Sequence, residues 1–274
     1  MPATLLATKR VEKPWGRHTL YPGFPDPAPA GEPIGEVWFQ SPHPEESELL
    51  IKYLFTSEKL SVQDHPSDEE AQKRGLPRGK DECWTILDAE PDSTIAIGPL
   101  APMTADELRE SALDGSIEHK LDWKPVTKGD FFYSHSGVIH AIGAGLTLIE
   151  VQQNSDTTYR LYDYGRPREL HLDDGIAVAE LTPWTPPSAP GEIEPGRTIL
   201  VEGPKFVLER WTGGDRQIAL PEGKTGWLVP IKGEGVVAGV AWKAGECVTV
   251  TGSEKLHASN DADLLFAYVG DRRI

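Results

Sequence analysis

The sequence has little cysteine and no long apolar run. Cys83 and Cys247 are the two cysteines among 274 residues, which excludes a disulfide framework and a thiolate-based zinc site. No apolar stretch reaches the length of a membrane-spanning helix, and the first residues lack the apolar core of a secretory signal. We therefore expect a cytoplasmic protein that contacts no membrane.

Positive charge is also scarce. The chain has 27 Lys and Arg against 43 Asp and Glu, which gives a formal net charge of −16. This balance disfavours nonspecific binding to nucleic acid, which needs a basic face. An anionic ligand would need a local cluster of Lys and Arg that acts against the overall field.

Turn-forming residues are abundant, with 27 Gly and 24 Pro. The short apolar runs between them favour a mainly β fold. Capping-box patterns at Ser67 and Thr104 predict two short helices, one over residues 67–74 and one over residues 104–114.

A proline-rich stretch divides the chain. Five prolines lie within residues 181–197, and this composition predicts a stiff, extended linker. We therefore expect a larger domain over residues 1–180, with helical insertions, and a second small barrel over residues 198–274.

Four polar groups in the first half offer chemistry. They are Gln63-Asp64-His65, Lys80-Asp81-Glu82, the segment from Gly129 to His140, and the segment that begins at Glu150. Residues two apart on a strand point to the same face, which pairs Gln63 with His65 and Lys80 with Glu82. Two imidazoles, a carboxylate and an amide oxygen suit a divalent metal, zinc first, with manganese, cobalt or iron as alternatives. An open coordination position would make such a site catalytic.

The segment that ends at His140 resembles the second cupin motif. It reads Gly129-x5-His135-x-Gly137-x2-His140. Two positions depart from the motif, because His135 replaces the usual proline and Ala144 the usual asparagine.

The first cupin motif is present in an interrupted form. Gln63-x-His65 is followed by Glu82 seventeen residues after His65, and the predicted helix lies between them. This arrangement resembles type I mannose-6-phosphate isomerases of the short bacterial form, and the resemblance covers most of residues 10–170. It implies two cupin-like jelly-roll barrels with a few short helices.

The resemblance also implies roles for individual residues. The metal, one ion per chain, would be held by Gln63, His65, Glu82 and His140. The catalytic residues would be Arg160, Lys80 and Glu150, and the substrate-binding residues Lys80, Arg160 and Asp156. The C-terminal barrel contains one histidine, His257, and is expected to bind no metal and to be degenerate.

The family's reaction is the interconversion of mannose 6-phosphate and fructose 6-phosphate by proton transfer through a cis-enediol, so a phosphorylated hexose is the expected partner. Burial that raises the pKa of Glu150 would make it the base, and desolvation of Lys80 would make that residue the base. Alternatively, Glu150 forms a structural ion pair with Lys80 or Arg160. A cupin oxygenase and a non-catalytic sugar-phosphate-binding cupin are alternatives, because cupin metal sites serve many reactions. The oligomeric state is open.

Overall fold

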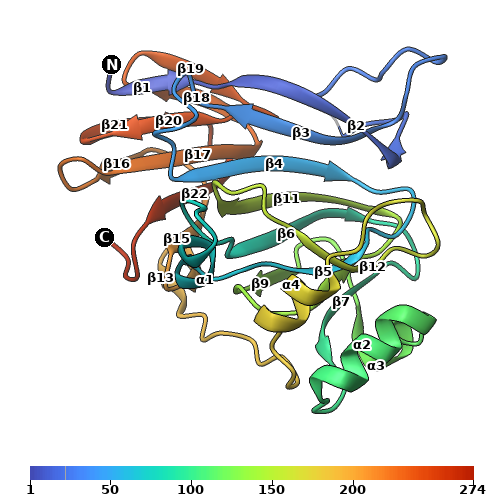
Figure 1. Cartoon of the computed structure of the whole chain (residues 1–274). Coiled ribbons are helices and arrows are strands. Elements are labelled where there is room, and N and C mark those ends of the chain that lie inside the picture. The colour runs from blue at the N-terminus through green and yellow to red at the C-terminus, as the bar shows by residue number, and fades with distance from the viewer. Residues whose placement is uncertain (22) are drawn as a thin grey trace.

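The structure is a computed structural model that describes residues 1–21 and 23–274. Its named strands form four antiparallel sheets, arranged as two barrels joined side by side (Figure 1). The expected mainly β fold of two cupin-like barrels with a few short helices is confirmed. None of the helices in the described part of the chain has the length and apolar content that crossing a membrane would require.

Two sheets form the first barrel. The six-stranded sheet contains, in order across it, β2 (Ala7–Arg17), β3 (Ile34–Gln40), β4 (Leu49–Phe55), β11 (Leu146–Gln153), β6 (Glu82–Ala89) and β9 (Phe131–Ser134). The five-stranded sheet contains β12 (Tyr159–Tyr162), β5 (Val62–Asp64), β10 (His140–Ile142), β7 (Thr94–Pro99) and β8 (Leu121–Pro125).

Two further sheets form the second barrel. The seven-stranded sheet contains β1 (Ala3–Leu5), β20 (Val248–Thr251), β17 (Thr225–Lys232), β22 (Asp263–Val269), β15 (Phe206–Thr212), β14 (Arg197–Glu202) and β13 (Gly191–Glu194). The four-stranded sheet contains β16 (Arg216–Ala219), β21 (Ser253–Ala258), β18 (Glu234–Val237) and β19 (Val240–Lys243).

The six- and seven-stranded sheets pack face to face. One apolar cluster takes side chains from both, including Ile51 and Tyr53 of β4 and Phe206 and Leu265 of the second barrel. Leu54 of β4 points to the other face, into the interior of the first barrel. Both faces of β4 are therefore buried, which explains its nearly continuous apolar sequence.

The structure departs from the expected domain boundaries at two places. β1 belongs to the expected first domain, yet it pairs with β20 of the second barrel. β13 lies within the expected linker, 181–197, yet it pairs with β14. The shared apolar core and these strands join the two barrels through more than a linker, and the division into independent domains stays a prediction.

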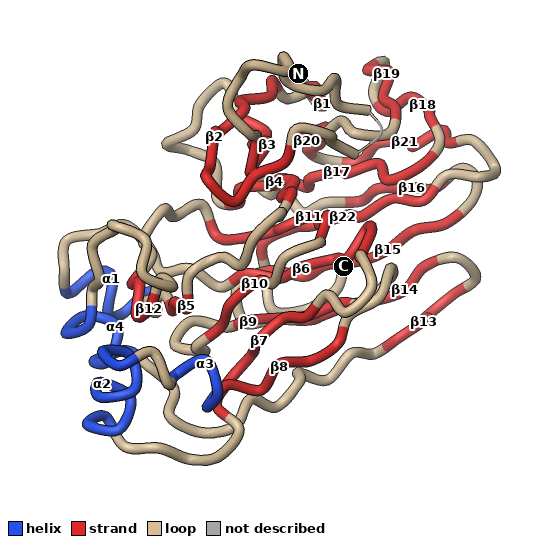
Figure 2. Tube along the Cα trace, turned by 90° about the vertical axis from the view of Figure 1, so that its right-hand side faces the viewer, coloured by secondary structure: helices blue, strands red, loops and turns tan. Residues whose placement is uncertain are grey.

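The helices gather at one end of the first barrel (Figure 2). They are α1 (Asp68–Lys73), α2 (Ala105–Asp114), α3 (Ile117–Lys120) and α4 (Leu172–Val178). Capping boxes at Ser67 and Thr104 begin α1 and α2 as the sequence predicts. The short helices α3 and α4 were not expected, and neither has a side-chain cap that the sequence could reveal.

Candidate active site

One row of side chains crosses the inner face of the six-stranded sheet. The strand registers place opposite one another, in turn, Lys9, Trp38, Lys52, Glu150, Trp84 and Phe132. Adjacent side chains on one face of a sheet interact directly. Accordingly, the Lys52 ammonium lies over the Trp38 ring, 4.8 Å from its centroid, and 3.0 Å from Glu150 Oε1.

Lys52 is the most buried of the charged site residues that the sequence analysis missed, which also include Lys9, Lys13 and Glu36. It is 5 % exposed in the middle of β4, among apolar neighbours on both sides along the chain. A lysine in such a run is a signal, because lysine is almost never fully buried unless it is paired. Burial lowers the pKa of Lys52, but the carboxylates of Glu150 and Glu36 outweigh it and raise the pKa above its usual value.

Three of the four expected metal ligands meet beside this row. His65, directly after β5, Glu82 at the start of β6 and His140 at the start of β10 are each about 1 % exposed, and their ligand atoms lie within 4.8 Å of one another. Glu82 Oε1 is 3.3 Å from His65 Nε2 and 3.0 Å from His140 Nε2. Bonds of about 2.1 Å to a single zinc ion would place ligand atoms at separations of this order.

Hydrogen bonds to the backbone orient both imidazoles. His65 Nδ1 lies 2.9 Å from the Thr157 carbonyl oxygen, and His140 Nδ1 lies 2.9 Å from the Val138 carbonyl oxygen. In each ring Nδ1 therefore carries the proton, and the Nε2 lone pair points toward Glu82. Two lone pairs and a carboxylate that converge on one point are the donor set for a cation.

The charges of His65 and Glu82 suit a metal site. Burial and the neighbouring Lys80 ammonium lower the pKa of His65 to about 3, so its ring is neutral and able to bind a metal. Burial opposes ionisation of Glu82, but Lys80 and His65 outweigh it and hold the Glu82 pKa well below its usual value. The structure thus brings together a buried His-Glu-His group that could hold a metal ion.

Gln63 lies next to this group. Its Nε2 is 3.3 Å from His140 Nε2, and its Oε1 accepts a hydrogen bond from Ser61 at 3.0 Å. An amide rotated by 180° fills the same space. It would donate its N–H to Ser61 and present its oxygen to the metal position. Gln63 as a ligand stays a prediction.

Lys80 lies beside the same group. Its Nζ is 2.9 Å from Glu82 Oε2 and 3.3 Å from His65 Nε2. Lys80 precedes β6, which begins at Glu82, so the two residues meet as the sequence analysis expects, but not through a shared strand face.

Glu150 has partners other than those considered from the sequence. Its carboxylate accepts hydrogen bonds from Lys52 at 3.0 Å and from Trp84 Nε1 at 3.1 Å. The alternative of a structural pair with Lys80 or Arg160 was wrong, because the β4–β11 register puts Lys52 directly opposite Glu150.

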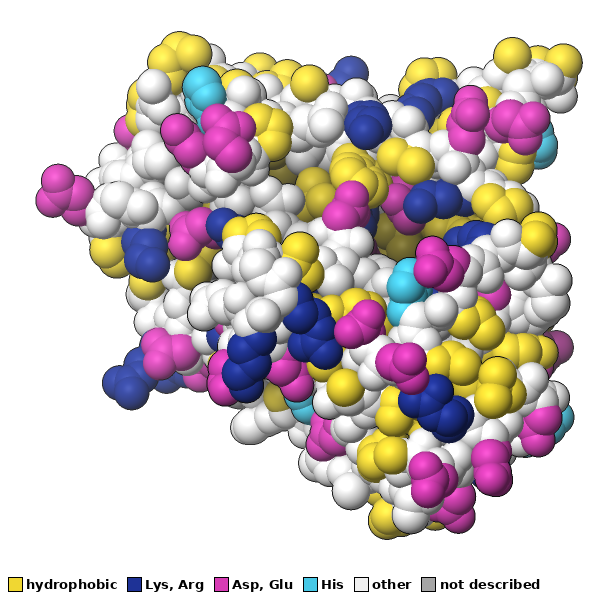
Figure 3. All heavy atoms as spheres, in the orientation of Figure 1, with side chains coloured by type: hydrophobic (Ala, Val, Ile, Leu, Met, Phe, Trp, Pro, Cys, Tyr) yellow, Lys and Arg dark blue, Asp and Glu magenta, His cyan; other side chains and the backbone are white. Residues whose placement is uncertain are grey.

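Gln63, Lys80, Lys52 and Glu150 line a cavity of about 370 Å³. The His65–Glu82–His140 group lies directly beside Gln63 and Lys80. Figure 3 shows the mouth of the cavity as a hollow with basic and acidic side chains around the rim, between β3 and β12. Its basic side chains are Lys9, Lys13, Lys52, Lys80, Arg160 and Arg168, and its acidic side chains are Glu36, Glu150 and Asp156. A cavity with three more basic than acidic residues, in a chain of net charge −16, is the local basic cluster that an anionic ligand requires.

Arg160 faces this cavity from β12. Its Nη1 donates to the Glu169 carbonyl oxygen at 2.7 Å, and its buried Nε has no hydrogen-bond partner in the described part of the chain. Burial and the neighbouring cation of Arg168 lower its pKa. A guanidinium with a free donor beside another cation favours a bound anion.

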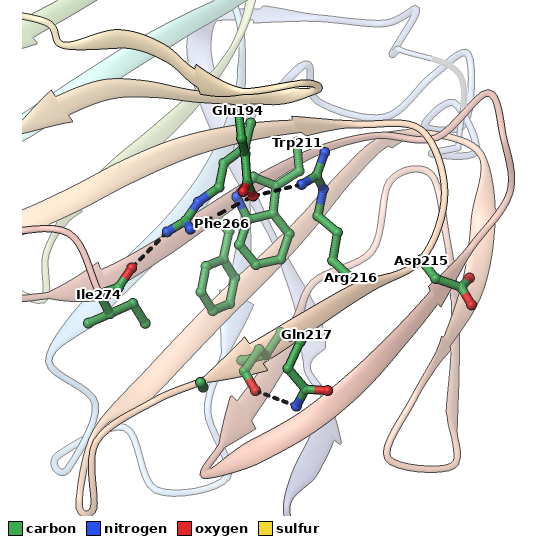
Figure 4. A pocket seen from close by; sticks show the side chains of 10 residues that line it. Glu194, Trp211, Asp215, Arg216, Gln217, Phe266 and Ile274 are labelled. Carbon is green, nitrogen blue, oxygen red and sulfur yellow. Dashed lines mark hydrogen bonds and ion pairs between the residues drawn. The ribbon is translucent and has the colours of Figure 1, made fainter.

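A second pocket, of about 350 Å³, lies in the C-terminal barrel (Figure 4). Its cations are compensated from within, because Arg197 pairs with Glu209 at 2.6 Å and Arg216 with Glu194 at 3.3 Å. In the first cavity Lys13, Lys52, Lys80 and Arg168 are also paired, with Glu36, Glu150, Glu82 and Asp163. Lys9 and Arg160 have no carboxylate partner in the described part of the chain, so the first cavity retains cations for a ligand.

Comparisons with known proteins agree with these observations. The chain is 42 % identical over 178 residues to mannose-6-phosphate isomerase ManA of Bacillus subtilis, an alignment that covers 60 % of this chain and 55 % of the relative. It is 37 % identical over 177 residues to mannose-6-phosphate isomerase of Streptococcus mutans, covering 60 % of this chain and 54 % of the relative. The resemblance to this family is confirmed. No protein-family model matches the chain.

The fold comparison extends further than the sequence alignments. The crystal structure of the mannose 6-phosphate isomerase from Bacillus subtilis has a TM-score of 0.83 and 27 % identity, and the match covers 97 % of this chain and 99 % of that one. The sequence matches to the two relatives, in contrast, span about half of the relatives' length. The likeness of fold thus includes the C-terminal barrel as well as the first.

Proposed function

We propose that this protein is a metal-dependent aldose–ketose isomerase that interconverts mannose 6-phosphate and fructose 6-phosphate. The observation that carries the proposal is the convergent His-Glu-His group in contact with Gln63 and Lys80, which line a cavity with six basic side chains. Likeness to proteins named mannose-6-phosphate isomerase supports the choice of substrate. The basic cavity favours a phosphorylated substrate over the substrates of a cupin oxygenase.

The cavity suits an anion whose binding orients a remote reacting centre. We assign Arg160 to the phosphate, because its guanidinium has a free buried donor and stands beside Arg168. Asp156 also lines the cavity and is proposed to accept hydrogen bonds from sugar hydroxyls. Binding energy at the phosphate end would hold C1 and C2 near the row of buried polar residues.

We assign the proton transfer to Glu150. Its carboxylate is held in place by the Lys52 ammonium and the Trp84 indole N–H, and it faces the cavity as a group that can accept a proton from C2. Returning that proton to C1, while one hydroxyl proton moves from O2 to O1, converts the aldose into the ketose. Lys80 is proposed to donate to the substrate oxygens rather than to act as the base, because its Nζ already contacts Glu82 and His65.

The proposed metal ligands are His65, Glu82, His140 and Gln63. We propose zinc, because imidazole nitrogens with one carboxylate are ligands that zinc favours. When bound, the ion supplies Lewis-acid stabilisation of negative charge on the enediolate oxygens.

The test is turnover of mannose 6-phosphate by the purified protein before and after chelation, and again after zinc is restored. Activity that is lost with chelator and returns with zinc is the expected result. Unphosphorylated mannose is the matched control substrate, and we expect it to turn over poorly because it lacks the group that Arg160 would bind. Fully zinc-loaded protein with no turnover of mannose 6-phosphate would contradict the proposal.

The choice between Glu150 and Lys80 has its own test. Mannose 6-phosphate deuterated at C2 exchanges its label with water if a base takes that proton. We expect Glu150→Gln to abolish this exchange and Lys80→Met to slow turnover while leaving some exchange. The reverse pattern would make Lys80 the base.

A further inference from the structure

The loop between β14 and β15 of the C-terminal barrel packs behind the segment that carries Lys80 and Glu82. Lys205, in this loop, places its Nζ 2.5 Å from Asp68 Oδ2 at the start of α1. This ion pair joins two residues that are 137 positions apart in the chain. The contact therefore connects the second barrel to the proposed active site of the first.

Asp68 is the centre of a small set of hydrogen bonds. Its Oδ1 accepts from the backbone N–H of Gly79 at 2.8 Å and from Gln153 Nε2 at 3.0 Å, while its Oδ2 faces Lys205. Partial burial raises the pKa of Asp68, but these donors outweigh it and lower the pKa below its usual value. The carboxylate is thus ionised and tied to three separate segments.

Gln153 hydrogen-bonds both Asp68 and Asp81. Its Oε1 accepts from the backbone N–H of Asp81 at 2.9 Å, and its own backbone N–H donates to the Asp81 carbonyl oxygen at 3.0 Å. Both backbone groups of Asp81 are therefore held by one residue. Lys80 and Glu82 flank Asp81 directly, so their backbone positions follow from this clamp.

A second route reaches Asp81 from the same loop. The Tyr133 hydroxyl donates to Asp81 Oδ2 at 2.6 Å, and the Tyr133 ring lies 5.7 Å from the ring of Phe206. The loop approaches so closely that a Cβ on Gly203 would lie 2.6 Å from the Tyr133 hydroxyl oxygen. Any side chain at Gly203 would displace Tyr133.

We propose that the 203–206 segment of the C-terminal barrel positions the Lys80–Glu82 segment, with Asp68 and Lys205 as positioning residues. This inference rests on the proposed function for its catalytic consequence, although the metal site alone suffices to test it. Partners that hold a ligand in place affect metal affinity and activity even though they touch neither metal nor substrate. Small displacements of such groups are costly because reacting atoms need close alignment.

The experiment compares Asp68→Ala, Lys205→Met and Lys205→Arg with the unaltered protein. Zinc affinity is measured by competition with a chromophoric chelator, and hydrogen exchange of backbone amides 79–82 by mass spectrometry. We expect Asp68→Ala and Lys205→Met to weaken zinc binding about tenfold and to speed exchange at residues 79–82. Lys205→Arg, which retains the charge and the donors, should remain close to the unaltered protein.

Lys232→Met is the matched control. Lys232 lies in the same barrel and pairs with Asp261 at 3.4 Å on the surface, where the pair has no connection to Lys80 or Glu82 in the described part of the chain. This variant should change neither zinc affinity nor exchange at residues 79–82. An equal effect of Lys232→Met and Lys205→Met would show general destabilisation and overturn the positioning role.

The outcomes separate this inference from the proposed function. Zinc affinity within about twofold of the unaltered protein, together with unchanged exchange at residues 79–82, in both Asp68→Ala and Lys205→Met would overturn the inference. If Asp68→Ala fails to fold, the two Lys205 variants still decide, because that side chain is partly exposed. Protein that shows the expected zinc and exchange effects but never isomerises mannose 6-phosphate would contradict the proposed function alone.

Where the positioning role and the proposed function both hold, Asp68→Ala and Lys205→Met should lower kcat with little change in KM. This pattern is expected when catalytic groups rather than phosphate contacts are displaced.

Discussion

Glu82 in the first barrel and Glu209 in the second are each at most 1 % exposed, and their polar settings are opposite. Glu209 in the second barrel is surrounded by donors: Arg197 at 2.6 and 2.8 Å, Trp211 Nε1 at 2.7 Å and the Tyr268 hydroxyl at 2.6 Å. Glu82 in the first barrel faces two imidazole nitrogens that point lone pairs toward it, with Lys80 as its ammonium partner. Protein donors thus satisfy both carboxylate oxygens of Glu209. Glu82 instead faces two imidazole nitrogens that are acceptors, where a carboxylate would need donors.

This difference shows what distinguishes a structural carboxylate from a metal ligand. A buried charge is stable only when paired and hydrogen-bonded. Glu209 meets this requirement internally, and its bond to Arg197 raises the pKa of the arginine. Around Glu82 the requirement is met fully only if a cation joins the two imidazoles and the carboxylate. Similar barrels thus serve packing in one half and a candidate metal site in the other.

Glu82→Gln separates the roles of Glu82 and Glu209 most clearly, and we expect it to have the largest effect on activity. Losing the carboxylate removes the anionic member of the His-Glu-His group. Zinc affinity should fall by more than the roughly 100-fold that loss of an outer partner can cost, and turnover should fall with it. Metal content after dialysis and kcat measure this effect, and retention of one zinc per chain would remove Glu82 from the ligand set.

Arg160→Ala should have the next largest effect. We expect kcat/KM for mannose 6-phosphate to fall about 100-fold or more, because a charged donor to the substrate is lost. Zinc content should change little, since the Arg160 side chain donates to the Glu169 carbonyl oxygen and has no hydrogen bond to His65, Glu82 or His140 in the described residues. A variant with normal kinetics would exclude Arg160 from the phosphate site.

Lys52→Met tests the role of the buried ion pair between Lys52 and Glu150. Removing the ammonium leaves Glu150 and Glu36 without their buried cation, which should lower the free energy of unfolding by about 3–5 kcal/mol. Turnover should also fall, because Glu150 would lose the partner that orients its carboxylate. The double variant with Glu150→Gln should recover part of the stability in urea titrations and none of the activity. Recovery of activity would show that Glu150 is not the base.

Glu209→Gln is the counterpart in the second barrel. It leaves Arg197 without its bidentate partner, and we expect unfolding to become easier by about 3 kcal/mol. Zinc affinity and kcat at a temperature well below the unfolding midpoint should be unchanged. A loss of zinc comparable to that of Glu82→Gln would show that the two carboxylates do not have separate roles.

The smallest effect is a pH dependence of stability in the metal-free protein. The pKa of His65 is lowered to about 3 by burial and Lys80, while an unfolded histidine titrates near 6.5. The unfolded chain therefore binds more protons as pH falls through this window, and stability falls with it. Glu82, whose pKa lies well below its usual value, adds a further loss below about pH 4.5. In urea titrations His65→Gln should show a shallower loss than the unaltered protein from pH 6.5 to about 4.5, and an equal slope would contradict this origin.

Local patterns in the sequence accounted for much of the fold. The capping boxes at Ser67 and Thr104 predict α1 and α2 because each cap involves residues only three positions apart. The mainly β class followed from short apolar runs between Gly and Pro. β13, in contrast, lies in a proline-rich stretch that reads as a linker, and it forms because β14 offers an edge to pair with.

For the candidate site, the sequence pattern identified the residue types and two close pairs, Gln63 with His65 and Lys80 with Glu82. The strand faces proposed for these pairs do not apply as stated, because His65 follows β5 and Lys80 precedes β6. Only the tertiary structure decided which groups meet. Glu150 meets Lys52 rather than Lys80 or Arg160 because the β4–β11 register places them opposite each other. Lys205 meets Asp68 because the second barrel packs against the first. Alternation along a strand is a local property that a sequence displays, whereas strand register and barrel packing depend on the whole buried core.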